Sequence, residues 1–167
     1  LPRGRIITVT GTVGTGKTVL LNEFLYRGIT KYGENGVFVS FEEQPRDIIK
    51  NLGNFGWDYP RLQQENKLSF VDLSPTPEGT VEVSADYDPS PILIRIKEAI
   101  RKTNAKRVVI DSIASLFNQF GNEAIVRRTI YRICTEIKKI GITGLITAEQ
   151  PDFGENFSGY GVEEFVT

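Results

Sequence analysis

Five short stretches rich in apolar and β-branched residues are spaced along the chain, and amphipathic segments lie between them. The predicted strands cover residues 5–10, 36–41, 67–73, 106–111 and 142–150. Strands that alternate with helices form mostly parallel sheets with helices on both faces. The pattern therefore predicts an α/β fold, and the length fits a single domain over residues 1–167.

Helices are predicted from the spacing of apolar residues between these strands. The clearest stripe steps by four and three residues, and it consists of Val126, Ile130, Ile133, Ile137 and Ile140. Further helices are expected over residues 17–32 and over residues 90–102, with Ser90 as N-cap. Another begins at Pro45 and is expected to turn Phe55 inward.

Composition and charge narrow the class of protein. Apolar residues make up 40% and charged residues 25%, as in ordinary soluble globular proteins. The net charge of −1 gives no general attraction to nucleic acid or anionic membranes, and no apolar run is long enough to span a membrane. The lone cysteine, Cys134, excludes a disulfide framework, and we expect a core position for it and a cytoplasmic location for the protein.

One connection between predicted elements is unusually long. Residues 74–91 lack periodicity, and no Lys or Arg occurs between Leu68 and Ile94. We expect a surface loop here, which is either a solvated connection or a docking site for a partner. The chain begins at Leu1 without Met and stops within VEEFVT, so truncation at both ends is also expected.

The stretch GTVGTGKT matches the P-loop pattern G-x-x-x-x-G-K-[ST]. A predicted strand leads in and a helix leads out, so backbone N–H groups and the helix N-terminus converge on phosphate oxygens. The predicted cradle consists of Gly11, Thr12, Val13, Gly14, Thr15, Gly16, Lys17 and Thr18. In it, Lys17 would contact the β- and γ-phosphates and Thr18 would bind Mg²⁺.

A P-loop needs an acid on a separate strand to hold hydrated magnesium. The stretch RVVIDS delivers Asp111 to a strand end, where open α/β sheets bind their ligands. Thr18 and Asp111 are therefore the predicted metal-binding residues, with capping of the next turn as the alternative role of Asp111. Ser112 is a candidate to support this acid by hydrogen bonding.

Two adjacent acids, Glu42 and Glu43, end the second predicted strand. Hydrolysis needs a group that orients a water molecule and accepts its proton. A regular strand would aim only one of the two at the phosphate, although a strand end can be irregular. Neighbouring like charges raise one pKa and make a better base, whereas a solvated pair near a helix start is the alternative. Gln150, at another strand end, is a further candidate to contact the γ-phosphate.

With these residues placed, the chain resembles the KaiC family of RecA-like ATPases, and within it the first, N-terminal ATPase domain. The resemblance rests on GTVGTGKT, FLYRGI, GVFVSFEEQPRDIIKN, FGWD, RVVIDS, VRR and YGVEEFV, and it covers nearly all 167 residues in order. It implies a P-loop NTPase of RecA type, with ATP as substrate and Mg²⁺ as cofactor. A circadian clock or related regulatory role is also implied.

The resemblance further implies roles for residues and partners. Glu42 and Glu43 match the family's catalytic glutamates, with Glu42 as the base, and Phe165 lies where the family begins to contact the adenine side. The family forms a hexameric ring with nucleotide at subunit interfaces. The Ser74–Asp88 loop matches the region that docks KaiB, a small thioredoxin-like partner. Further strands and basic residues of the family domain would follow Thr167, so the activity of this chain alone is left open.

Three functions remain open at this point. They are regulated ATP hydrolysis, a nucleotide-gated assembly scaffold with little turnover, and a DNA-recombination or helicase-type RecA motor. The acidic loop and near-neutral charge disfavour the motor, because it would need basic loops facing a central channel.

Structural roles are the first interpretation for a tryptophan and for three arginines. Trp57 is expected to be a packing anchor. Arg127, Arg128 and Arg132 are expected to form a solvated helix face paired with Glu136, and contact with another subunit is the alternative.

Overall fold

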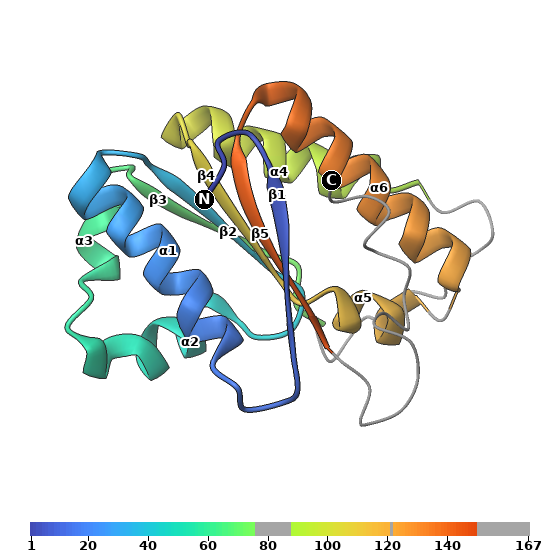
Figure 1. The fold of residues 1–167 in the computed structure, drawn as a ribbon, viewed down its shortest axis with the longest axis horizontal. Coiled ribbons are helices and arrows are strands. Elements are labelled where there is room, and N and C mark those ends of the chain that lie inside the picture. Colours follow the sequence, from blue (N-terminus) through green and yellow to red (C-terminus); the bar gives the residue numbers. More distant parts are fainter. Residues whose placement is uncertain (76–87, 121, 150–167) are drawn as a thin grey trace.

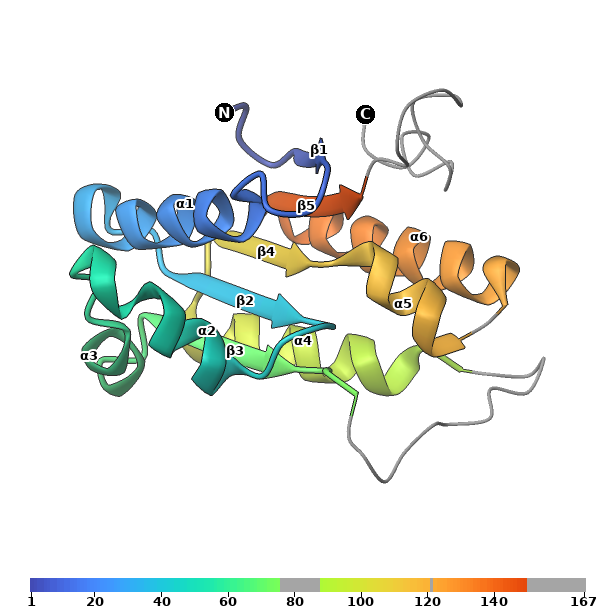
Figure 2. The ribbon, with the colours of Figure 1, turned by 90° about the horizontal axis from the view of Figure 1, so that it is seen from below.

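A computed structural model describes residues 1–75, 88–120 and 122–149. Its described strands form one parallel sheet in the order β1-β5-β4-β2-β3 (Figure 2). The strands are β1 (Ile6–Gly11), β2 (Gly36–Ser40), β3 (Leu68–Asp72), β4 (Arg107–Asp111) and β5 (Thr143–Glu149). All five predicted strands are confirmed, with ends that shift by at most one residue. Because the strands are parallel, their carboxyl ends lie along one edge of the sheet.

Helices cover both faces of the sheet, as predicted (Figure 1). One face carries α1 (Lys17–Tyr32), α2 (Pro45–Leu52) and α3 (Tyr59–Gln64), and the other carries α4 (Ser90–Thr103), α5 (Ile113–Phe120) and α6 (Glu123–Ile140). The two layers enclose separate apolar clusters. In β2, Val37 and Val39 face the α4–α6 layer, whereas Phe38 faces the α1–α3 layer. Each fully buried side chain of this size stabilises the fold by about 1.5–3 kcal/mol.

The segment after α2 differs from the prediction. The helix that begins at Pro45 ends at Leu52, and the chain continues in a short 3₁₀ turn, η1 (Gly53–Phe55). Phe55 is therefore 51% exposed instead of facing inward, and its ring stacks on Trp57 at 4.9 Å. Trp57 also stacks on Tyr26 at 5.4 Å, in agreement with its expected packing role.

Two details of α4 and α6 also correct the sequence analysis. Ser90 is the first residue of α4 and Pro89 is its cap. The Ser90 amide and hydroxyl both donate to Asp88. Glu136 pairs with Lys97 of α4 at 2.5 Å and with Lys139 at 2.9 Å. The expected pairing of Glu136 with the arginines is therefore wrong for two of them, which contact other acids. These contacts are Arg127–Glu123 and Arg132–Asp88.

The core prediction for Cys134 is confirmed. Its side chain is 1% exposed within the α4–α6 cluster, and burial raises the pKa of the thiol to about 11. The group is therefore a protonated, apolar filler at neutral pH. None of the helices in the described ranges is both long and apolar enough to cross a membrane.

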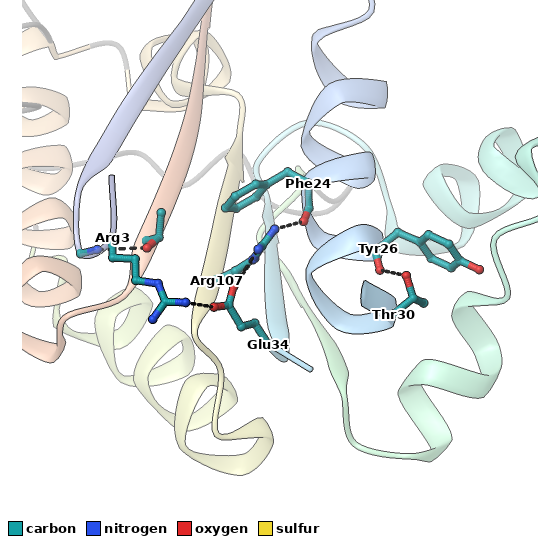
Figure 3. A network of polar contacts seen from close by, with 8 residues as sticks. Arg3, Phe24, Tyr26, Thr30, Glu34 and Arg107 are labelled. Atoms are coloured by element: carbon teal, nitrogen blue, oxygen red, sulfur yellow. Dashed lines mark hydrogen bonds and ion pairs between the residues drawn. The ribbon is translucent and has the colours of Figure 1, made fainter. Parts of the chain in front are cut away.

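Arg107, the first residue of β4, is a half-buried arginine that bonds to α1 at the end of the sheet opposite the strand carboxyl ends (Figure 3). The Arg107 guanidinium lies 4.5 Å from the ring centre of Phe24 and 5.2 Å from that of Tyr32. It donates to the Phe24 carbonyl oxygen and to Glu34, both at 2.7 Å, and Glu34 also contacts Arg3 at 3.5 Å. Charge-assisted bonds and two aromatic faces thus hold a side chain that is only 13% exposed.

Candidate active site

The loop between β1 and α1 is an exposed turn shaped by two glycines. Gly14 and Gly16 have φ angles of 78° and 83°, in the left-handed region that residues with a Cβ rarely adopt. Gly16 immediately precedes α1, and no side chain caps the first turn of this helix. The first amide groups of α1 therefore point out of the helix, together with the positive end of its dipole. No acidic residue lies in that first turn to neutralise it.

Lys17 is folded back into this loop. Its ammonium group donates to the carbonyl oxygens of Gly11 at 2.7 Å and of Thr12 at 2.8 Å. The Thr12 carbonyl oxygen also accepts from the Thr15 hydroxyl at 2.8 Å, which closes the turn. Positive charge, free amides and glycine backbone thus surround one small region, and this combination suits a phosphate group.

Asp111, the last residue of β4, joins three elements. One of its carboxylate oxygens accepts from the Thr18 hydroxyl of α1 at 2.6 Å, and the other accepts from the Thr147 hydroxyl of β5. The expected partner, Ser112, does not have this role, because its hydroxyl donates to Glu42 instead. Thr18 and Asp111 are therefore in direct contact, close enough for one metal ion to bind both oxygens.

Glu42 and Glu43 follow β2 at the same edge of the sheet. The Phe41 amide donates to the Asp111 carbonyl oxygen at 2.7 Å, which fixes the end of β2 beside the end of β4. The Glu42 carboxylate accepts from Ser112 at 2.9 Å and from Ser115 at 3.1 Å. Contacts therefore run without a break from the P-loop helix through Thr18 and β4 to the Glu42 carboxylate.

Glu43 differs electrostatically from its neighbour. Partial burial of the carboxyl, on a residue that is otherwise exposed, and then the negative charges of Glu42, Asp111 and Asp47 raise the pKa of Glu43 above its ordinary value. The main chain of Glu43 is held in place, because its carbonyl oxygen accepts from the Ser40 hydroxyl at 2.5 Å. A cation at this edge of the sheet would relieve the crowding of negative charge.

The remaining predicted site residues lie outside the described part of the chain. They are Gln150 and Phe165, together with residues 76–87 of the expected docking loop. At the described borders of that loop, Ser74 donates to Asp72 at 3.0 and 2.6 Å, and Asp88 accepts from Ser90 at 3.0 and 2.7 Å. These four residues form matching short turns where the loop leaves β3 and enters α4.

Comparison with known proteins decides the family. A family model described as "ATPase: KaiC" matches residues 1–167, the whole chain. The chain belongs to the KaiC family of ATPases. Its RecA-like α/β fold and P-loop agree with the resemblance seen in the sequence.

Curated relatives named "Circadian clock oscillator protein KaiC" match the whole chain. The protein from Parathermosynechococcus lividus is 47% identical over 167 residues, which is 31% of its own length. The proteins from Synechococcus elongatus and Prochlorococcus marinus subsp. pastoris are 48% and 46% identical, and the match covers 32% and 33% of their lengths. The chain thus spans about a third of these KaiC proteins.

Two residues of this KaiC-family site were missed by the sequence analysis. Thr147 directly follows the apolar pair Leu145 and Ile146 in the inner strand β5, and its hydroxyl is buried against Asp111. A polar residue at such a position is a signal that sequence reasoning can use, because buried polar groups need partners. Ser115 lies one helical turn after Ser112, but only the fold brings both to Glu42.

The oxygen atoms at Thr18 and Asp111 fit magnesium. Mg²⁺ usually takes one or two protein oxygens and fills its remaining positions with water and substrate phosphates. Within the described ranges, no three His, Cys, Asp or Glu side chains gather into a site that could hold a metal by themselves. A hydroxyl and a carboxylate 2.6 Å apart beside a phosphate cradle match this sparse type of coordination.

Proposed function

We propose that this KaiC-family domain binds ATP with Mg²⁺ and hydrolyses it at the carboxyl edge of its sheet. The observation that carries the proposal is the continuous contact between the P-loop helix, Asp111 and the segment holding Glu42. It gathers a phosphate cradle, two metal-binding oxygens and a carboxylate that can accept a proton. Family membership supports nucleotide as the substrate.

The proposed roles follow from the chemistry of each group. The amides of Gly11–Thr18 would surround the phosphates, and Lys17 would exchange its carbonyl contacts for β- and γ-phosphate oxygens. Thr18 and Asp111 would hold Mg²⁺, which when bound neutralises charge on the phosphates. Phe165 is proposed for the adenine side on the resemblance alone.

In the chemical step, Glu42 would orient a water molecule and accept its proton. The water oxygen forms a bond to the γ-phosphorus, the bond from that phosphorus to the bridging oxygen breaks, and ADP leaves with the electron pair. Glu43, close to Glu42 and Asp111, would keep this region negative and thereby favour binding of the cation.

The proposed setting is a hexameric ring with nucleotide between subunits, in a circadian clock or a related regulatory system. Relatives named as clock oscillator proteins support the second part of this proposal. Docking of a KaiB-like partner through Ser74–Asp88 belongs to the same proposal and rests on the resemblance. The acidic character of residues 68–94 speaks against a nucleic-acid motor.

The test is Glu42→Gln in the complete natural chain. The amide keeps the size of the side chain but cannot accept a proton as a carboxylate does, so phosphate release should fall by about 10²–10⁴-fold while ATP affinity stays unchanged. Phosphate release and nucleotide binding are measured on the same samples. Glu98→Gln, on the exposed face of α4, is the matched control. Unchanged phosphate release in Glu42→Gln would refute the assignment.

A further inference from the structure

Two serine hydroxyls meet on a single oxygen of Glu42. Ser112 Oγ lies 2.9 Å and Ser115 Oγ 3.1 Å from Glu42 Oε2, and the two hydroxyl oxygens are 3.2 Å apart. Among the described residues, no hydrogen bond to the second oxygen, Oε1, is seen, and the Glu42 side chain is exposed. The carboxylate is thus held by one oxygen, and no hydrogen bond within the described ranges occupies the other.

The fold fixes both serines at this place. Ser112 directly precedes α5, and Ser115 follows three residues later, so the two lie on one side of the helix start. The other side is anchored in the core by Ile113 and Leu116, each 1% exposed. The helix therefore cannot rotate the two hydroxyls away from Glu42 without exposing apolar surface.

The segment that carries Glu42 is anchored as well. The preceding residue, Phe41, is buried in the core cluster that contains Ile113 and Leu116, and its amide donates to Asp111. The carboxylate is therefore presented from a fixed backbone position to a fixed pair of donors. Such support on both sides is what holds a reacting group within a fraction of an ångström.

The two serines have an alternative, purely structural explanation. A serine just before a helix commonly caps it by accepting an amide of the first turn. Here both hydroxyls also lie within donating distance of Glu42 Oε2, and their 3.2 Å separation lets one donate to the other while that one donates to the carboxylate. The pair orients an exposed carboxylate, which a capping role does not require.

We propose that Ser112 and Ser115 are positioning residues that fix Glu42 by Oε2, so that Oε1 is the oxygen that accepts the proton of the attacking water. This inference rests on the proposed function of Glu42 as the base. Neither serine is assigned a contact with nucleotide. Their removal should therefore change the rate of the chemical step and leave ATP binding unchanged.

The experiment compares Ser115→Ala, Ser115→Thr and wild type in the complete natural chain. Loss of one donor should lower single-turnover phosphate release by about tenfold without changing ATP affinity, because the carboxylate gains rotational freedom. Threonine keeps the hydroxyl, so Ser115→Thr should restore most of the rate. Thr30→Ala, which removes an exposed helical hydroxyl at the other end of α1, should have no effect.

A double variant separates this inference from the proposed function. If Glu42→Gln abolishes turnover, adding Ser115→Ala should lower the rate no further, since the two changes act on the same step. Normal or faster release in Ser115→Ala, with Glu42→Gln inactive, overturns the positioning role and leaves the function standing. Full release in Glu42→Gln overturns both.

Discussion

At the scale of single residues, negative charge is the dominant feature of the carboxyl edge. The Glu43 carboxyl is partly buried and lies near three other acids, Glu42, Asp111 and Asp47. Burial and these negative charges together raise its pKa. The raised pKa of Glu43 means that the folded protein holds this proton more tightly than the unfolded chain does. Ionisation of Glu43 therefore weakens the fold when no cation is bound.

Glu43→Gln should consequently stabilise the nucleotide-free protein at neutral pH. In the wild type, the protonated Glu43 carboxyl adds to the stability of the fold. This stabilisation is fully present below the ordinary pKa of 4.5 and is lost as the pH rises through the raised pKa of the folded protein. Because Glu43 is exposed and its charge is screened by solvent, the variant should melt at most about 1 °C higher than wild type at pH 7 and show no such gain at pH 4. Thermal unfolding at both pH values, with Glu98→Gln as control, measures this. An equal difference at both pH values would contradict it.

The sequence predicted the part of the site that is local in the chain. The spacing of GTVGTGKT specifies a loop whose backbone forms the cradle, and a strand that ends in Asp111 specifies a position at the sheet edge. The sequence does not predict that Thr147 bonds to Asp111, because the two residues belong to different strands that only the fold places side by side. Ser112 was assigned to the adjacent Asp111, although the fold turns its hydroxyl toward Glu42.

At the scale of elements, packing of α1 on the sheet depends on one close approach. A Cβ added to Gly28 would lie 2.5 Å from Arg107 Cδ, 2.6 Å from Nε and 2.8 Å from Cζ. Gly28 thus leaves room for the guanidinium between Phe24 and Tyr32. Any larger residue would displace the arginine from its two aromatic faces and from Glu34.

Gly28→Ala should therefore destabilise the protein by about 1–3 kcal/mol, since overpacking at Arg107 outweighs the gain in helix propensity. Urea unfolding monitored by Trp57 fluorescence would measure the change. Gly53→Ala is a suitable control, because Gly53 has a right-handed conformation and open space at its Cβ position. That control should be neutral or slightly stabilising. Equal stability of Gly28→Ala and wild type would show that the arginine moves without cost.

The elements that sequence patterns missed are short. α3 spans only Tyr59–Gln64, fewer than two turns, so an apolar period cannot be recognised in it. α5 follows β4 almost directly and carries the apolar stripe Ile113, Leu116, Phe117 and Phe120. For an apolar stripe this short, directly after a strand, periodicity alone does not distinguish a helix from a continued buried strand. Long helices such as α6 were predicted because their stripe persists over several turns.

At the scale of the whole molecule, the order of strands determines which residues can meet. β5 lies between the P-loop strand β1 and the acid strand β4, and β2 lies on the far side of β4. The site therefore extends across four neighbouring strands along one edge of the sheet. The alternation of strands and helices predicts a parallel sheet, but it does not predict the order of the strands. That order depends on pairing between strands that are far apart in the sequence.

Nucleotide-dependent assembly is the prediction at this scale. If nucleotide lies between subunits, the complete natural chain should increase about sixfold in mass by light scattering with Mg-ATP, and Glu42→Gln should assemble equally well because it retains binding. Phosphate release is measured from the same samples. Assembly on a non-hydrolysable analogue with negligible wild-type turnover would favour the scaffold function. A mass that stays at that of one chain under all conditions would contradict the ring.

Arg107 and Asp111 are the first and last residues of β4, and each bonds to α1, one at Phe24 and one at Thr18. Two hydrogen bonds thus attach α1 to the two ends of β4. A helix attached in this way resists sliding along the strand. The glycine turn that precedes α1 would then adapt to the phosphates without moving this helix along β4.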